Sequence, residues 1–186
     1  MKILGGALKG RNFYMPAGCR PTQDVVRKAL FDILGQDMTG LTVLDVFAGS
    51  GAVGLEALSR GAKFCTFIEK EPKHARITEE NADLLGLEAY EVLLQDGFAG
   101  IKSLAGQKRH FDIVFVDPPY GRQLAKKALK TLNGYDIVHA HSTVIIQHDK
   151  AEALTESEGS LRLFRTKKQG STLLSFYKKG TPSDGK

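Results

Sequence analysis

Cysteine is scarce in this chain of 186 residues, which has only Cys19 and Cys65 and no closely spaced pair. Two distant cysteines do not make a disulfide framework, so the composition favours a reducing, cytoplasmic environment. No apolar run approaches the roughly 18 to 20 residues that span a bilayer, and the first residues lack the apolar core of a signal peptide. The five histidines do not have the spacing of metal ligands. We therefore expect a cytoplasmic protein that does not enter a membrane and holds no metal ion.

Positive charge, in contrast, is present in excess and is unevenly distributed. The formal net charge is +5, and residues 1–30 hold six basic residues against Asp24 alone. The rest of the chain is balanced between basic and acidic residues. Such a basic N-terminal arm favours contact with a polyanion, because Lys and Arg neutralise phosphates whatever the nucleic-acid sequence. The alternative is an ordinary solvated surface.

The hydrophobic pattern predicts one α/β domain. Hydrophobic residues make up 42% of the chain, enough for one domain with a sizeable core. Periodicities of strand and helix alternate along it. Strands are expected at 42–47, 63–69, 90–94, 111–116 and 143–147, helices at 22–36, 51–60, 72–85, 97–105 and 122–132, and a terminal hairpin at 161–165 and 172–177. This alternation predicts a doubly wound, mostly parallel sheet, to which the hairpin adds an antiparallel strand.

The two ends of the chain are expected to lie outside this domain. Glycines punctuate residues 3–15 and predict a short hairpin, so residues 1–21 are interpreted as a β-hairpin and basic arm. The main domain is expected to span residues 22–178. Thr22 is a good N-cap for the helix with which this domain begins. Residues 179–186 are expected to be a disordered tail.

The central motif is Val43–Gly54, where an apolar run carrying Asp45 turns through glycines into a helix. Glycines 49 and 51 let the backbone approach a ligand where a Cβ would block it. The spacing Gly49-x-Gly51-x-x-Gly54 also fits the dinucleotide fingerprint of dehydrogenases. Asp45 argues against a dehydrogenase, because a carboxylate at the end of the strand repels a pyrophosphate. The same carboxylate can receive the ammonium group of S-adenosylmethionine.

Acidic residues stand at the ends of three successive predicted strands, namely Asp45, Glu69 and Asp96. In an open α/β sheet these ends converge on one crevice. Glu69 lies 20 residues beyond Gly49 and is placed to accept hydrogen bonds from ribose hydroxyls. Asp96 is then expected to meet an adenine amino group. Each acid alone could instead be an N-cap or a solvated carboxylate.

The sharpest signal is Asp117-Pro118-Pro119-Tyr120, directly after the strand at 111–116. Two prolines fix the backbone in a rigid turn that aims the Asp117 carboxylate and the Pro118 carbonyl at one point. An exocyclic amine on a planar base needs two such acceptors, because its lone pair is delocalised into the ring. The Tyr120 ring offers a stacking surface for that base. The alternative is a structural Pro-Pro turn with an ordinary N-cap acid.

Together, four segments resemble one known family: Asp45–Gly51, Leu55–Ala62, Asp117–Tyr120 and the stretch from Arg20-Pro21-Thr22 to Arg27–Phe31. It is the family of bacterial small-subunit (16S) rRNA guanine-N2 methyltransferases, S-adenosylmethionine-dependent enzymes with the class I methyltransferase fold. The resemblance covers nearly the whole chain. It implies a Rossmann-like, seven-stranded, mostly parallel sheet with an antiparallel C-terminal strand and an N-terminal hairpin that holds ribosomal RNA.

The resemblance also implies roles for particular residues. Those expected to bind S-adenosylmethionine are Thr22, Asp45, Phe47, Ala48, Gly49, Ser50, Gly51, Glu69, Lys70, Asp96 and Gly97. Those expected to contact RNA are Lys9, Arg11, Arg20 and Arg27, and the catalytic set is Asp117, Pro118, Pro119 and Tyr120. The expected reaction transfers a methyl group to N2 of one guanine in 16S rRNA, on RNA or on an assembling 30S subunit. We expect a monomer.

The sequence departs from the family pattern at two positions and leaves three alternatives open. Asp32 stands where the family usually has Asn, and Gln147 stands near a usual Glu. The DPPY motif alone also fits DNA adenine-N6 and cytosine-N4 methyltransferases. A dehydrogenase would leave Asp117–Tyr120 unexplained. A non-catalytic RNA-binding domain would bind RNA but not S-adenosylmethionine. Such a domain would not need the residues expected to bind this methyl donor, all of which are intact here.

Overall fold

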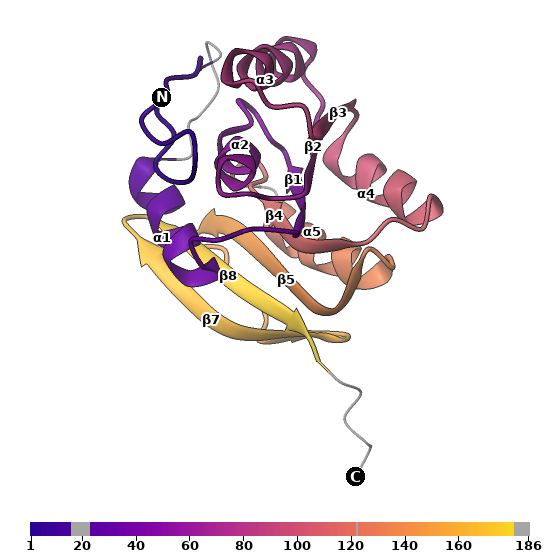
Figure 1. The fold of residues 1–186 in the computed structure, drawn as a ribbon. Helices are drawn as coiled ribbons and strands as arrows, with labels where there is room; N and C mark the ends of the chain where they lie inside the picture. The colour runs from indigo at the N-terminus through magenta and orange to yellow at the C-terminus, as the bar shows by residue number, and fades with distance from the viewer. Residues whose placement is uncertain (16–22, 122, 181–186) are drawn as a thin grey trace.

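The computed structural model describes residues 1–15, 23–121 and 123–180. They form an eight-stranded sheet in the order β3-β2-β1-β4-β5-β8-β7-β6 (Figure 1). The strands are β1 (Thr42–Val46), β2 (Phe64–Glu69), β3 (Tyr90–Leu94), β4 (Phe111–Val116), β5 (Val138–Asp149), β6 (Ser157–Glu158), β7 (Leu161–Gln169) and β8 (Thr172–Lys179). The first five pair in parallel and the last three pair antiparallel. This is the α/β methyltransferase fold, and the short strand β6 adds an eighth strand to the seven expected.

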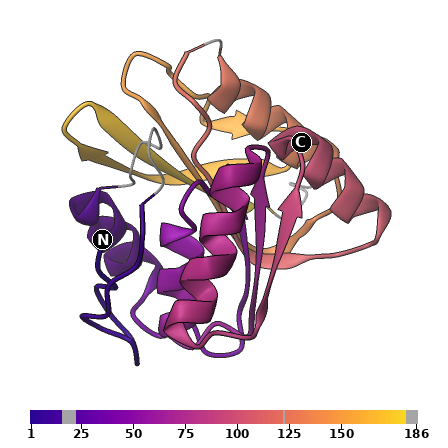
Figure 2. The same cartoon turned by 90° about the horizontal axis from the view of Figure 1, so that it is seen from above.

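Helices cover both faces of the sheet, as Figures 1 and 2 show. The helices are α1 (Asp24–Leu34), α2 (Ala52–Ser59), α3 (Pro72–Leu85), α4 (Gly97–Gly106) and α5 (Leu124–Gly134). One buried cluster joins α1, α2 and α3 to one face through residues such as Leu30, Leu55 and Phe115. The other joins α4 and α5 to the opposite face through residues such as Ile101 and Leu129. Strands β1, β2 and β4, which are buried on both sides, are therefore apolar along most of their length, whereas the edge strand β3 is only half-buried.

Most predicted elements agree with the structure to within two residues, and three match completely: 72–85, 90–94 and 111–116. A larger difference is in β7, which runs to Gln169, four residues beyond its expected end. The helix expected at 22–36 begins at Asp24 and ends at Leu34, with Gln23 at the N-cap position, and Thr22 lies outside the described residues. Strand β5 is longer than expected at both ends, because Val138 pairs with Phe111 of β4 and because β8 pairs with residues of β5 up to Asp149. Strand β8 likewise extends to Lys179, the first residue of the expected tail.

The N-terminal segment folds back on itself and docks against α2. Lys2 and Asn12 form an antiparallel bridge, so the expected hairpin is a short one. The backbone N–H of Leu4 donates to Glu56 Oε2 at 2.8 Å, and that of Leu8 donates to Ser59 Oγ at 3.0 Å. These long-range bonds fix the segment on the helix that follows the glycine turn.

Beneath this segment lies a buried ionic cluster of Arg27, Glu56 and Arg60. Glu56 has no exposed surface, and its Oε1 accepts from Arg60 at 2.7 Å while its Oε2 lies 3.5 Å from an Arg27 nitrogen. Arg27 is also fully buried and donates to Asp24 and to the Lys2 carbonyl. The prediction that Arg27 contacts RNA is therefore wrong, because its guanidinium is held inside the protein.

This cluster predicts a large stability effect. Replacing Glu56 by alanine leaves two buried guanidinium groups without their shared carboxylate, so Glu56→Ala should lower the free energy of unfolding by about 3–5 kcal/mol. Urea denaturation measures this change. As a control, Glu80→Ala removes the exposed i,i+4 partner of Arg76 and should cost at most about 1 kcal/mol. Equal effects of the two variants would show that the cluster is not a buried charge network.

Candidate functional site

The glycine turn between β1 and α2 forms a tight loop with three residues at positive φ. These are Phe47 at 63°, Gly49 at 60° and Gly51 at 75°, and the Gly51 N–H donates to the Ala48 carbonyl at 2.8 Å. A Cβ on Gly51 would lie 2.7 Å from Thr78 Cγ2. Glycine is thus required at position 51 both by its φ and by its neighbour. Ser50 is buried within the same loop.

The third glycine of the motif has a packing function. A Cβ on Gly54 would lie 2.2 Å from the Phe67 ring and 2.5 Å from Cys65 Sγ. Gly54 therefore lets α2 pack closely on β2, the contact that the third glycine makes in nucleotide folds.

Asp45 is buried at the carboxyl end of β1. Its Oδ2 accepts the Gly54 N–H at 3.0 Å, one of the donors that a helix leaves unpaired in its first turn. Burial raises the pKa of the Asp45 carboxyl to about 8, the Gly54 hydrogen bond opposes this shift, and the charges of Asp117 and Glu69 add to it. At neutral pH the carboxyl therefore carries a proton until a cation lies beside it.

Glu69 closes the far side of the glycine turn. Its Oε2 accepts the Gly49 N–H at 2.8 Å, and its Oε1 accepts the Glu71 N–H at 2.8 Å. The carboxylate thus joins the end of β2 to the glycine turn. Each oxygen retains a second lone pair, which a hydroxyl donor can use.

Asp96 and Gly97 lie at the start of α4. Asp96 is the N-cap of α4, and its Oδ1 accepts hydrogen bonds from the N–H groups of Phe98 and Ala99. This oxygen therefore has the helix-capping role that was the alternative to ligand binding. A Cβ on Gly97 would lie 2.5 Å from the Phe47 ring, which also packs edge-to-face on Phe98. The ring of Phe47, a residue of the glycine turn, is thereby fixed against the start of α4.

The remaining expected donor-site residues are less constrained. Ala48 donates its N–H to the Ile68 carbonyl, and Lys70 is exposed beyond the end of β2. Thr22 lies outside the described residues.

Two residues of α3 also hold the glycine turn, and sequence reasoning missed both. Thr78 Oγ1 donates to the Gly49 carbonyl at 3.1 Å, and Asn81 Nδ2 donates to the Ser50 carbonyl at 3.1 Å. Asn81 also exchanges two hydrogen bonds with the backbone of Tyr14. Both side chains are fully buried polar groups in a helix, which is the available signal for such a role.

The DPPY segment continues the sheet beyond β4. The Asp117 N–H donates to the Val46 carbonyl at 3.3 Å, and Pro118 is buried while Pro119 is exposed. Tyr120 Oη lies 2.7 Å from Thr172 Oγ1, at the start of β8. The terminal hairpin therefore positions the tyrosine, a contact that the sequence alone did not predict.

Strand register brings three of the acids and one amide to the same face. Asp45 pairs with Phe67 of β2 and Phe115 of β4, and Phe115 pairs with Ile145 of β5. Two residues further along these three neighbouring strands stand Glu69, Asp117 and Gln147. Because side chains alternate along a strand, these residues share the face that carries Asp45. Residues at the carboxyl ends of four strands therefore share one face, whereas Asp96, the third strand-end acid expected there, is the N-cap of α4.

Gln147 is the member of this group without an expected role. It is 5% exposed, and its Oε1 finds no hydrogen-bond partner among the described residues. An unpaired buried acceptor is costly, which is why such groups mark positions that a ligand donor completes.

The expected RNA contacts lie on the N-terminal segment. Lys9 and Arg11 are exposed, and Arg11 also donates to the Leu84 carbonyl at 3.0 Å. Arg20 lies outside the described residues, and Arg27 is buried as described above. Within the described part of the chain there is no group of metal-binding side chains. No helix in that part is long and apolar enough to cross a membrane.

The fold and site together define a class I methyltransferase. The criteria are the strand order, the glycine turn after β1, the acid at the end of β2 and the DPPY segment after β4. Within this class, the chain belongs to the family described as "Conserved hypothetical protein 95", whose model matches residues 1–178.

Named relatives support this assignment. The chain is 33% identical over 182 residues to "Putative rRNA methyltransferase YlbH" of Bacillus subtilis, covering 96% of this chain and 99% of the relative. It is 32% identical over 181 residues to "Ribosomal RNA small subunit methyltransferase D" of Escherichia coli K12, covering 96% and 90%. The solved structure of "Putative methyltransferase yhhF from Escherichia coli" matches with a TM-score of 0.85 and 31% identity, covering 97% and 98%.

The raised pKa of Asp45 predicts a pH-dependent stability. Between about pH 4 and pH 8 the folded protein keeps a proton on Asp45 that the unfolded chain releases, so this contribution to the free energy of unfolding falls as pH rises. Asp45→Asn removes the titration and keeps an oxygen for the Gly54 N–H. The free energy of unfolding of the variant, relative to that of the wild type, should therefore rise by up to about 1.4 kcal/mol per pH unit. This difference should stop rising above about pH 8.

Urea denaturation of the protein alone, from about pH 5 to about pH 9, measures this difference. Glu79→Gln, on the exposed side of α3, serves as the control for removing one carboxylate. A constant difference between Asp45→Asn and wild type across this range would disprove the buried, protonated state.

Proposed function

We propose that this protein transfers the methyl group of S-adenosylmethionine to the exocyclic N2 of a guanine in 16S ribosomal RNA. The observation that carries the proposal is the convergence of the DPPY segment with Asp45 and Glu69 on one face at the carboxyl ends of neighbouring strands. Relatives named as small-subunit rRNA methyltransferases support the choice of substrate. A DNA adenine-N6 methyltransferase would share the site chemistry but has no counterpart among these relatives.

The residues present fit S-adenosylmethionine. The buried Asp45 carboxyl needs a cation to ionise, and the donor's ammonium group provides one. Glu69 has lone pairs left for the ribose hydroxyls, and Asp96 has a second oxygen for the adenine amino group. The glycine turn, with Phe47, Ala48 and Ser50, lines the same region, and Lys70, Gly97 and Thr22 complete the proposed set.

When bound, the donor would supply an electrophilic methyl group on a sulfonium, whose S–C bond breaks as the N–C bond forms and which leaves as S-adenosylhomocysteine. The protein's task is to present the guanine N2 in line with that group. The Asp117 carboxylate and the Pro118 carbonyl accept hydrogen bonds from the two N–H groups of the amine. These two hydrogen bonds orient the lone pair of the nitrogen toward the methyl group. Tyr120, held by Thr172, stacks on the base. The methylated nitrogen then loses a proton to Asp117 or water, so most of the rate gain comes from alignment.

Binding of the RNA is assigned to the N-terminal segment. Lys9 and Arg11 are exposed there and can neutralise phosphates, and Arg20 is proposed as a third contact. We further propose that the protein acts as a monomer in the cytoplasm, on RNA or on an assembling small subunit.

The proposed reaction is tested by transfer of labelled methyl from S-adenosylmethionine to small subunits that lack the modification, followed by nucleoside analysis. Label in N2-methylguanosine is the expected result. Label in another nucleoside would overturn the guanine assignment. No transfer to subunits or rRNA, together with transfer to duplex DNA, would favour the DNA methyltransferase.

Asp117 gives a separate test of the mechanism. Asp117→Ala removes one acceptor of the amine and should lower the methylation rate by about a hundredfold or more, because an electrostatic group at the reacting atom is lost. Asp117→Asn keeps one oxygen and should lose less. Calorimetric titration with S-adenosylhomocysteine checks that the donor site survives in both variants. Near-normal turnover of Asp117→Ala would remove Asp117 from the mechanism.

A further inference from the structure

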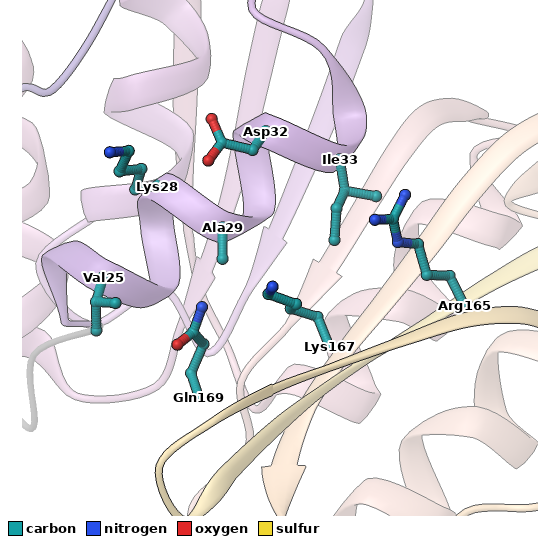
Figure 3. A pocket seen from close by; sticks show the side chains of 8 residues that line it. All are labelled: Val25, Lys28, Ala29, Asp32, Ile33, Arg165, Lys167 and Gln169. Atoms are coloured by element: carbon teal, nitrogen blue, oxygen red, sulfur yellow. The ribbon is translucent and has the colours of Figure 1, made fainter.

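A groove of about 180 Å³ runs between α1 and β7 and has no role in the methyl-transfer site described above. Figure 3 shows its two walls, with side chains of α1 facing side chains of β7. Lys28 and Asp32 are the charged residues of the α1 wall. Arg165, Lys167 and Gln169 form the β7 wall. Three cations against one carboxylate give the lining a positive charge.

The β7 wall exists because of a β-bulge. Leu163 pairs with Tyr177, but the next pair is Arg165 with Phe176, so Phe164 is the extra residue. Leu163 and Tyr177 pack in the α4 and α5 cluster, whereas Phe176 packs in the cluster of α1, α2 and α3. The bulge thus turns the following alternate residues to the α1 side, as bulges beside binding sites do. Without it, Arg165 and Lys167 would face away from α1.

The groove leads to the candidate active site. Gln169, its last residue on β7, pairs with Thr172 across the hairpin tip. Thr172 Oγ1 is the group that lies 2.7 Å from Tyr120 Oη. One end of the groove is therefore one cross-strand pair away from the residue proposed to stack on the target base.

The groove also connects to the N-terminal segment. A neighbouring hollow of about 450 Å³ shares Val25, Lys28 and Asp32 with it and is lined in addition by Lys9. Basic side chains therefore extend from Lys9 past Lys28 of α1 to Lys167 of β7, and the carboxylates among them are Asp24 and Asp32. At the bulge, the Phe164 side chain is 49% exposed and offers an aromatic surface next to Arg165.

We propose that the groove between α1 and β7 binds the sugar-phosphate backbone of the substrate RNA on one side of the target guanine. Lys28, Arg165 and Lys167 neutralise phosphates, Gln169 offers an amide to the strand as it enters the active site, and exposed Phe164 stacks on a flanking base. This inference rests on the proposed function. It extends the RNA-binding surface from the N-terminal segment to the C-terminal hairpin, the same hairpin that holds Tyr120 through Thr172.

The first test compares the double variant Lys28→Gln/Lys167→Gln with wild type for binding of naked 16S rRNA, from about 50 to about 300 mM KCl. Each lost phosphate contact should reduce the salt slope by about 0.7, so the double variant should bind about 25-fold more weakly at about 0.1 M salt. The matched control is Lys102→Gln/Lys108→Gln, which removes two exposed lysines on and beside α4, across the sheet from the groove (Figure 1). The control should keep wild-type affinity and slope.

The second test strengthens binding, an effect that misfolding does not produce. Asp32 is the one carboxylate among the described residues that line the groove, and it repels phosphates. Asp32→Asn should tighten RNA binding roughly threefold. Asp136→Asn, in the exposed turn between α5 and β5, makes the same chemical change away from both the groove and the N-terminal segment and should have no effect.

The two proposals fail in different ways. If wild type transfers no methyl group to rRNA or small subunits, the proposed function is wrong. If wild type methylates them, but the groove variants match their controls in affinity and salt slope, only the groove proposal is wrong. Tighter binding of an acidic peptide than of RNA, lost in Lys28→Gln/Lys167→Gln, would also overturn it in favour of a protein partner.

Discussion

The carboxylate of Glu56 is the interaction on which the surrounding structure most depends. It is fully buried, and it joins three segments that are distant in the sequence: the N-terminal segment through the Leu4 N–H, α1 through Arg27, and its own helix through Arg60. In a medium of low dielectric constant, neither guanidinium can lose this partner cheaply. Because α2 begins at the glycine turn, the same carboxylate couples the position of α1 and the N-terminal segment to that turn.

A second constraint comes from the geometry of parallel strands. Register and alternation place Asp45, Glu69 and Asp117 on one face at one edge, where the charges of Asp117 and Glu69 add to the effect of burial in raising the pKa of Asp45. The structure accommodates the carboxyl groups of Glu69 and Asp45 in different ways. Glu69 is satisfied by backbone N–H groups, whereas the Asp45 pKa rises to about 8. A cation beside Asp45 would therefore stabilise the ionised form of this carboxyl.

The C-terminal hairpin gives this scaffold a function beyond extending the sheet. Thr172 at its tip holds Tyr120, and the bulge at Phe164 turns Arg165 and Lys167 toward α1. The same two strands thus support the proposed catalytic ring and supply one wall of a basic groove. The other wall is α1, whose position is fixed by the Arg27–Glu56 pair. The glycine turn, Tyr120 and the groove are therefore parts of one connected structure.

The sequence alone determined the fold class, the glycine turn, the strand-end acids and the DPPY segment, because these depend on local signals. Strand 111–116 is a continuous apolar run, and helix 72–85 begins at Pro72 and ends before Gly86 in a left-handed conformation. Tertiary structure alone decided that Arg27 is buried, that Thr78 and Asn81 hold the turn, and that Thr172 meets Tyr120. Each of these contacts joins residues at least 29 positions apart. No local pattern encodes such a pairing, because it depends on how separate elements pack around a shared core.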